Sequence, residues 1–99
     1  MKALLTDEAK SDLLTIARFI ARDSLARAAT FVAELEDRCS RLADMPLAYP
    51  LVPGYERSGV RRRPYGQYLI FYRVENDRIL VLHVLHGAMD VEAVLFPDQ

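Results

Sequence analysis

Residues 68–86 read YLIFYRVENDRILVLHVLH, and this stretch decides the fold. Residues 68–74 have the two-residue alternation of a β-strand, which places side chains on two opposite faces. The first face carries Tyr68, Ile70 and Tyr72, and the second carries Leu69, Phe71 and Arg73. Residues 75–78 (ENDR) are typical of a hairpin turn. Residues 79–86 are apolar on both faces until their end, which predicts a central strand of a sheet.

Two amphipathic helices are predicted before this hairpin. The first covers residues 7–22, because Thr6 is a good N-cap and acidic residues follow it ahead of an apolar stripe at helical spacing. Ser24 offers a second N-cap, and the next helix, of about five turns, is expected to end before Pro46. A connection this short makes the two helices antiparallel neighbours with one apolar face.

The rest of the chain predicts a loop, two further strands and one helical turn. Residues 45–59 contain three prolines and two glycines, and predict an ordered loop. Residues 2–5 and 60–63 have strand character, and residues 90–95 suit a single turn of helix. The helical hairpin must bury its apolar face on the sheet. The sequence therefore predicts an α+β fold, with an N-terminal strand and an antiparallel helical hairpin packed on a small, mainly antiparallel β-sheet.

The composition describes a folded, nearly neutral chain with one dense basic segment. Its residues 1–99 suit a single domain, and 52% of them are hydrophobic, which argues against disorder. The formal net charge is -1, yet residues 57–63 contain four arginines and no acid. The lone Cys39 is interpreted as a small core or semi-buried residue. A single cysteine excludes an intrachain disulfide and fits a reducing cytoplasm. No signal peptide or apolar run of about 18 residues is visible, so we expect a cytoplasmic protein that does not cross a membrane.

Four stretches, taken together and in this order, resemble the RelE/ParE superfamily of bacterial toxins, and its ParE branch in particular. They are LADMP at residues 42–46, RRRPYG at 61–66, YLIFYRV at 68–74 and ILVLHVLHGAMD at 79–90. Together they extend over nearly the whole chain. The resemblance implies a RelE/ParE-like fold and the toxin of a type II toxin–antitoxin pair.

The ParE resemblance further implies inhibition of DNA gyrase, a block of replication, and neutralisation by a ParD-like antitoxin, with no hydrolytic activity and no cofactor. RelE-type relatives are instead ribosome-dependent mRNA endonucleases, which use an arginine followed by a tyrosine near the C-terminus. This sequence has no tyrosine after Tyr72 and no lysine or arginine after Arg78. We therefore expect no catalytic residue. A RelE-like mRNA interferase and a non-toxic interaction module with the same fold are the alternatives.

Six residues are predicted to bind a protein partner: Arg57, Arg61, Arg63, Arg73, His86 and Met89. Arg61 and Arg63 share one strand face, and Arg62 takes the other. Such arginines suit acidic groups of an antitoxin or a nucleic acid, whereas shielding of a sheet edge from aggregation is the alternative interpretation. No sequence-specific DNA binding by this chain alone is expected.

The remaining polar candidates have plainer interpretations. His83 lies inside an apolar strand and is predicted to be a hydrogen-bonded histidine of the sheet. Tyr65, Tyr68 and Tyr72 near arginines suit base stacking on RNA, but strand alternation explains two of them by packing. Two histidines without matching acids or cysteines make no metal site.

Overall fold

A computed structural model describes residues 1–98 of the chain. The elements in order are β1 (Lys2–Leu5), α1 (Asp7–Ala21), α2 (Leu25–Arg41), the short 3₁₀ helix η1 (Glu56–Ser58), β2 (Val60–Tyr65), β3 (Tyr68–Glu75), β4 (Arg78–His86) and α3 (Val91–Leu95). Every element predicted from the sequence is present, and the strand expected over residues 60–63 continues to Tyr65. The predicted α+β fold is confirmed.

The four strands form one sheet in the order β1-β4-β3-β2. β1 runs parallel to β4 and the other neighbours are antiparallel, so the sheet is mainly antiparallel, as predicted. β4 lies between β1 and β3, which confirms the central position indicated by its two apolar faces. A bulge in the β3–β4 ladder pairs Phe71 with His83 but Tyr72 with Val81, so Leu82 is the extra residue. The sequence did not reveal this bulge.

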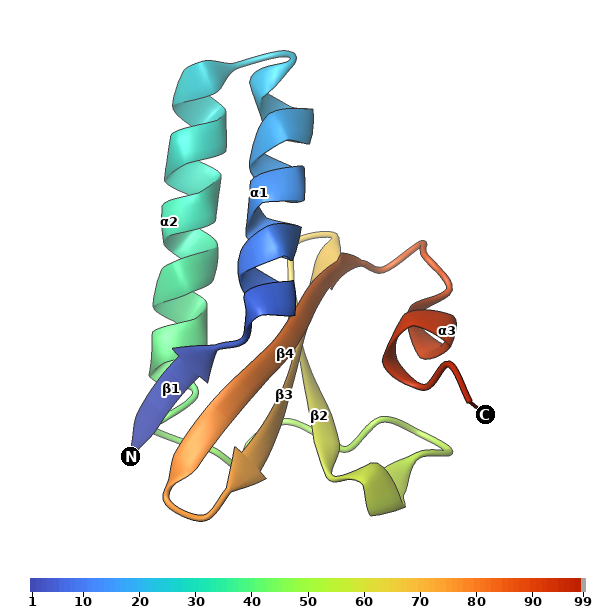
Figure 1. Ribbon diagram of the computed structural model, residues 1–99. Helices are drawn as coiled ribbons and strands as arrows, with labels where there is room; N and C mark the ends of the chain where they lie inside the picture. Colours follow the sequence, from blue (N-terminus) through green and yellow to red (C-terminus); the bar gives the residue numbers. More distant parts are fainter. Residues whose placement is uncertain (99) are drawn as a thin grey trace.

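The helical hairpin lies against one face of the sheet, and its upper half extends beyond the strands (Figure 1). Thr6 caps α1, because its Oγ1 accepts a hydrogen bond of 3.2 Å from the N–H of Ala9. The same hydroxyl donates to the carbonyl of Val81 in β4 at 2.9 Å. Ser24 caps α2 by accepting a hydrogen bond of 3.1 Å from the N–H of Arg27. The caps start both helices where the sequence predicts, and Thr6 also ties α1 to the centre of the sheet.

Two apolar clusters lie on opposite faces of the sheet. The larger one, under the helical hairpin, includes Leu13, Ile16, Phe31, Leu35, Cys39, Ile70, Tyr72 and Val81. The smaller one includes Val52, Val60, Phe71 and Leu85. The alternation predicted for residues 68–74 is therefore confirmed, and so is the core position of Cys39, which is 3% exposed. Burial of one leucine-sized side chain such as Leu35 contributes roughly 2 kcal/mol to folding.

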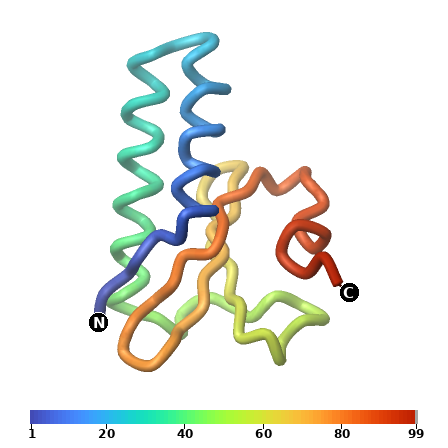
Figure 2. The backbone as a smooth tube through the Cα atoms, in the orientation of Figure 1, coloured from blue at the N-terminus to red at the C-terminus, as the bar shows by residue number. Residues whose placement is uncertain are grey.

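Residues 42–59 run from the end of α2 along the lower end of the sheet to the outer edge of β2 (Figure 2). At that edge the N–H of Val52 donates to the carbonyl of Val60 at 2.9 Å, and the N–H of Arg62 donates to the carbonyl of Pro50 at 3.1 Å. These backbone hydrogen bonds cover the edge of β2. The edge of β2 therefore does not need charged side chains to protect it from aggregation. This weakens the interpretation that the β2 arginines serve only to shield the edge.

α3 covers the face of the sheet opposite the helical hairpin. Asp90 caps its first turn through a side-chain hydrogen bond of 3.3 Å. The ring of Phe96 stacks on the ring of Tyr55, with centroids 4.1 Å apart and planes inclined by 5°. Val91, Leu95 and Phe96 also pack against the smaller apolar cluster. The chain's own C-terminal segment therefore covers part of this face of the sheet.

Candidate partner-binding site

An apolar cavity of about 350 Å³ lies between α1, the first residue of β3 and the end of β4, and we name it the α1–β4 groove. Helix α1 contributes side chains that are three or four residues apart and therefore share one helical face. The turn that follows β4 contributes the opposite rim. The groove is lined by residues that include Thr15, Ile16, Phe19, Tyr68, His86 and Met89.

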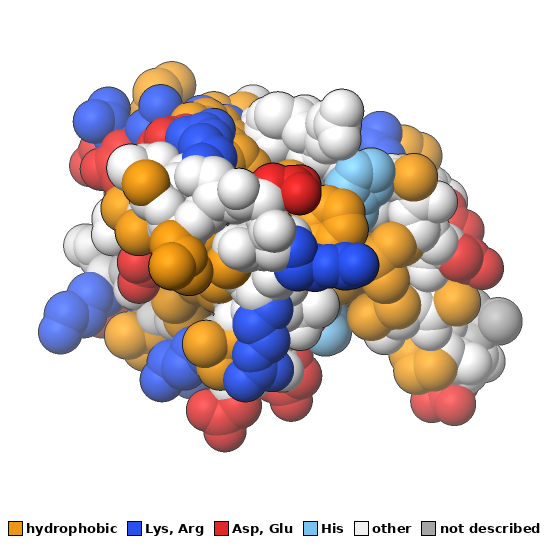
Figure 3. All heavy atoms as spheres, turned by 90° about the horizontal axis from the view of Figure 1, so that it is seen from above, with side chains coloured by type: hydrophobic (Ala, Val, Ile, Leu, Met, Phe, Trp, Pro, Cys, Tyr) orange, Lys and Arg blue, Asp and Glu red, His pale blue; other side chains and the backbone are white. Residues whose placement is uncertain are grey.

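Two large apolar side chains stand exposed at this groove. Phe19 is 60% exposed and Met89 is 48% exposed. Figure 3, which looks onto this end of the molecule from above, shows hydrophobic side chains gathered beside the histidines. Exposed apolar groups around a hollow are typical of a surface that binds another molecule. The α1–β4 groove is therefore the best candidate for a protein contact.

Asp12 occupies the free edge of β4 where β1 has already ended. One carboxylate oxygen accepts a hydrogen bond of 2.8 Å from the N–H of Val84, and the same oxygen lies 2.8 Å from Nδ1 of His83. Because an ionised carboxylate is only an acceptor, this contact places a proton on Nδ1 of His83. The predicted role of His83 as a hydrogen-bonded sheet residue is confirmed. Asp12 also prevents an added strand from pairing at Val84.

His86 has a defined orientation where it lines the groove. Its Nδ1 accepts a hydrogen bond of 3.0 Å from the N–H of Ala88, and its Nε2 lies 3.2 Å from Oε1 of Gln67. In the neutral ring the proton is therefore on Nε2 and is donated to Gln67. The ring also meets the ring of Tyr68 edge-on, with centroids 5.2 Å apart. His86 is thus held in place as part of the groove wall.

Arg61 and Arg63 lie on the same face of β2, as predicted, and both reach Tyr49. Arg61 donates a hydrogen bond of 2.7 Å to the carbonyl of Tyr49. The guanidinium of Arg63 lies over the ring of Tyr49, 5.2 Å from its centroid. Within residues 1–98 neither arginine forms an ion pair with a carboxylate. Their charges therefore remain available to another molecule.

The other two predicted arginines lie elsewhere. Arg73 forms two hydrogen bonds to one carboxylate oxygen of Glu75, so its charge is matched within the chain. Arg57 is exposed in η1, beside the Tyr55 and Phe96 stack. The structure thus brings His86 and Met89 together in the α1–β4 groove and Arg61 and Arg63 together on β2. It leaves Arg57 and Arg73 outside both sets.

Among the groove residues, sequence reasoning predicted only His86 and Met89 to bind a partner, and it did not assign Phe19, Tyr68 or Asp12 to the site. Phe19 falls outside the apolar stripe of its helix, and an exposed phenylalanine in such a position was the available signal. Tyr68 was assigned to packing, and it does pack on Phe31, with ring centroids 5.5 Å apart. Asp12 gave no signal, because its partners His83 and Val84 are more than 70 residues away along the chain.

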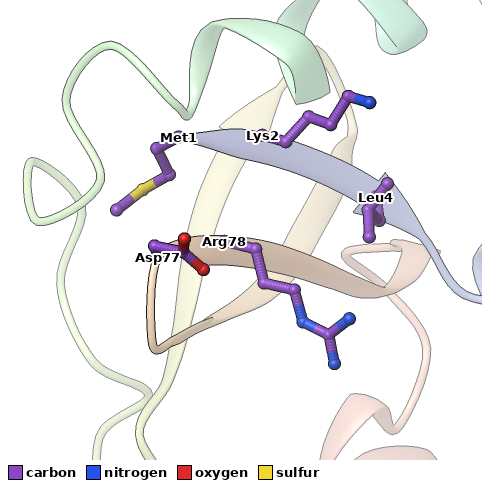
Figure 4. Close-up of a pocket in the computed structure, with 5 residues that line it drawn as sticks. All are labelled: Met1, Lys2, Leu4, Asp77 and Arg78. Atoms are coloured by element: carbon purple, nitrogen blue, oxygen red, sulfur yellow. The ribbon is translucent and has the colours of Figure 1, made fainter.

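A wider hollow of about 770 Å³ lies beside β1 and is drawn in Figure 4. Its charged side chains Lys2 and Arg78 extend away from each other, so no polar groups converge on a ligand there. Within residues 1–98, no three histidine, cysteine, aspartate or glutamate side chains are close enough to hold a metal ion. No helix in this part of the chain is long and apolar enough to cross a membrane.

Comparison with known proteins agrees with this fold. A solved chain described as "Chromosomal ParDE TA system from P. aeruginosa" superimposes with a TM-score of 0.68 and 20% sequence identity, covering 83% of this chain and 90% of that chain. No curated protein matches the sequence. A family model described as "ParE toxin of type II toxin-antitoxin system, parDE" matches residues 3–91. Because that match extends from β1 to the start of α3, the chain belongs to the ParE toxin family of type II toxin–antitoxin systems.

Proposed function

We propose that this ParE-family chain is a cytoplasmic toxin that inhibits DNA gyrase, blocks replication and is neutralised by a ParD-like antitoxin. Family membership supports the toxin assignment. The observation that carries the partner assignment is the α1–β4 groove, where Phe19 and Met89 are exposed around an apolar hollow. An amphipathic helix of a partner binds such a groove by inserting apolar side chains at helical spacing. We assign the groove to the antitoxin.

We propose that the arginines of β2 add charged contacts with the antitoxin to the apolar contacts in the α1–β4 groove. Arg61 and Arg63 have no carboxylate partner within residues 1–98, and Arg57 is exposed nearby in the sequence. Acidic side chains of the antitoxin complement these cations. Charge pairs of this kind raise the association rate and the specificity more than the affinity.

The chain acts by binding rather than by hydrolysis. A RelE-type cleavage needs a base for the ribose 2′-hydroxyl, cations for the phosphorane-like transition state and an acid for the leaving oxygen. Here Arg73 is already matched by Glu75, and α3 packs over part of the sheet face opposite the hairpin. The sequence beyond Arg78 also lacks the tyrosine and the arginine of the nuclease relatives. These observations support a non-enzymatic toxin.

A supercoiling assay with purified gyrase tests the proposal. The toxin is expected to inhibit supercoiling, and a stoichiometric amount of the antitoxin is expected to restore it. Mapping of mRNA cuts on translating ribosomes is the parallel measurement. Codon-specific cuts by the intact chain that disappear in His86→Ala would replace this proposal with the mRNA interferase. Absence of both activities would leave a non-toxic interaction module.

A further inference from the structure

A second, smaller cavity of about 200 Å³ lies between the last turns of α2, the loop that follows and β2. We name it the Arg63 pocket. Three guanidinium groups and one aromatic ring lie around it, from Arg38, Arg41, Arg63 and Tyr49. It differs from the α1–β4 groove in that three arginines and one aspartate stand among its lining residues, beside the apolar side chains of Leu42, Met45 and Ala48. Its position on α2 and β2 also separates it from the α1 and β4 residues of that groove.

Arg63 is held at the pocket by stacking. Its guanidinium lies 5.2 Å from the ring centroid of Tyr49 and 5.8 Å from that of Tyr65, and Arg38 lies 4.9 Å from the same Tyr65 ring. Arg63 also donates one hydrogen bond to the carbonyl of Pro64. Contacts with the flat faces of the guanidinium orient it while leaving further N–H groups at its edge. This arginine is therefore pre-organised to bind a carboxylate side-on with two hydrogen bonds.

The charges around the Arg63 pocket leave room for one negative charge. One oxygen of Asp37 accepts from Nη1 of Arg38 at 2.7 Å and from Nε of Arg41 at 2.8 Å. Asp44 is the only acid among the residues that line the pocket in the described part of the chain. Three arginines and these two aspartates leave one positive charge uncompensated. That charge is the complement of a single carboxylate.

A nucleic acid fits these charges poorly. Its backbone carries one negative charge per nucleotide, and binding depends on several phosphates being neutralised at once. Asp37 and Asp44 would repel the phosphates that flank the first one. The volume of the pocket suits one amino-acid side chain, whereas a strand of nucleotides needs an extended groove. The observations therefore favour an acidic side chain of a protein.

We propose that the Arg63 pocket binds one glutamate or aspartate side chain of the antitoxin, with Arg63 as the bidentate partner and with Arg38 and Arg41 completing the positive wall. The identity of the protein that supplies this side chain rests on the proposed function. The chemistry of the pocket does not, because it follows from the charges and stacking in the toxin alone.

The first experiment tests the pocket in the free toxin. N-acetylglutamate amide, which carries a single carboxylate, is titrated into ¹⁵N-labelled protein while the arginine Nε–Hε resonances are followed by NMR. Saturable shifts are expected at Arg63 and Arg41, with none at Arg78. The neutral N-acetylglutamine amide is expected to cause no shift. Absence of saturable shifts with the glutamate probe would overturn the proposal.

Matched variants on one strand locate the effect. Arg63→Gln is expected to weaken binding of the glutamate probe by roughly tenfold or more, and Arg63→Lys by less, because lysine keeps the charge but loses the planar fork. Arg62→Gln, on the opposite face of β2, is expected to leave probe binding unchanged. If Arg62→Gln and Arg63→Gln weaken binding of the glutamate probe equally, the effect is one of general charge, and the proposal that the Arg63 pocket binds the carboxylate is overturned.

Two further measurements separate the sources of the anion. Inorganic phosphate and a short single-stranded DNA are titrated in the same way, and tighter binding of the DNA at Arg63 would replace the acidic side chain with a nucleic acid. In the toxin–antitoxin complex, Arg63→Gln is expected to raise the dissociation constant about tenfold relative to Arg62→Gln. An unchanged constant, with the glutamate probe still binding, would overturn the antitoxin as the source. Failure of gyrase inhibition would overturn the proposed function and leave the probe result intact.

Discussion

The hydroxyl of Tyr65, at the end of β2, donates a hydrogen bond of 2.6 Å to Glu34 in the middle of α2. The other carboxylate oxygen of Glu34 accepts from Arg27 at 2.8 Å. The hydrogen bond from Tyr65 is the main reason that the pKa of Glu34 lies below its ordinary value, and the contact with Arg27 comes next. The same hydrogen bond raises the pKa of Tyr65. This contact joins the helical hairpin to the far strand of the sheet.

Stability should depend on pH through this pair. Because the pKa of Glu34 is lowered by folding, its contribution is present above the ordinary glutamate pKa and is lost as the pH falls through the native value. Tyr65→Phe removes the main cause of that shift. The midpoint of urea unfolding should therefore be lower in Tyr65→Phe than in the natural chain near pH 7, and the difference should shrink towards about pH 3.

Tyr68→Phe is the matched control for this measurement, because among the described residues the hydroxyl of Tyr68 makes no hydrogen bond to a carboxylate. The difference in the midpoint of urea unfolding between Tyr68→Phe and the natural chain should be the same near pH 7 and at about pH 3. A difference for Tyr65→Phe that is the same at both pH values would contradict the assignment to Glu34.

The thiol of Cys39 should be unreactive in the folded protein. Burial raises its pKa to about 12, so almost no thiolate is present near pH 8. A disulfide reagent such as DTNB is expected to modify Cys39 slowly in buffer and completely in denaturant. Because the pKa of this thiol is higher in the folded chain than in the unfolded chain, the thiol ionises first in the unfolded chain as the pH rises. Stability should therefore fall at alkaline pH. Rapid modification of the native chain would show that α2 opens easily.

Phe19→Ala should weaken antitoxin binding without destabilising the toxin. The side chain is 60% exposed, so its removal should change the free energy of unfolding by about 0.5 kcal/mol or less. If it packs against the antitoxin in the α1–β4 groove, its loss should cost about 1.5–3 kcal/mol of binding, which is a loss of affinity of roughly tenfold or more. Isothermal titration calorimetry with the antitoxin measures this.

Leu25→Ala provides the comparison for Phe19→Ala. Leu25 begins α2, is 78% exposed and lies outside the lining of the groove. Its removal should leave the affinity nearly unchanged. Equal losses in the two variants would indicate a contact along the whole outer surface of the helical hairpin instead of the groove.

Thr6→Ala should destabilise the chain more than Ser24→Ala, although both remove a helix N-cap. A lost cap costs about 1 kcal/mol. Thr6 also donates to the carbonyl of Val81 at 2.9 Å, whereas Ser24 lies at the exposed end of the hairpin. The additional hydrogen bond contributes roughly 1 kcal/mol more. Equal midpoints of urea unfolding for the two variants would show that the link to β4 adds nothing.

Local patterns in the sequence were sufficient to predict the helices and strands. The alternation of residues 68–74 and the caps at Thr6 and Ser24 each depend on neighbours within a few residues, and each is present in the structure. The core position of Cys39 follows from helical spacing in the same way. The β-bulge at Leu82 is a different case, because no residue near it in the sequence departs from a strand pattern.

The sequence by itself determined the α+β fold, the faces of the strands and the presence of four arginines in residues 57–63. Only the tertiary structure decided what each arginine contacts: Arg61 meets the carbonyl of Tyr49, Arg63 stacks on rings from two elements, and Arg73 is matched by Glu75. The α1–β4 groove likewise forms only when α1 is packed beside the end of β4. The physical reason is that periodicity and capping are set by neighbours along the chain, whereas charge compensation and cavities depend on residues that packing alone brings together.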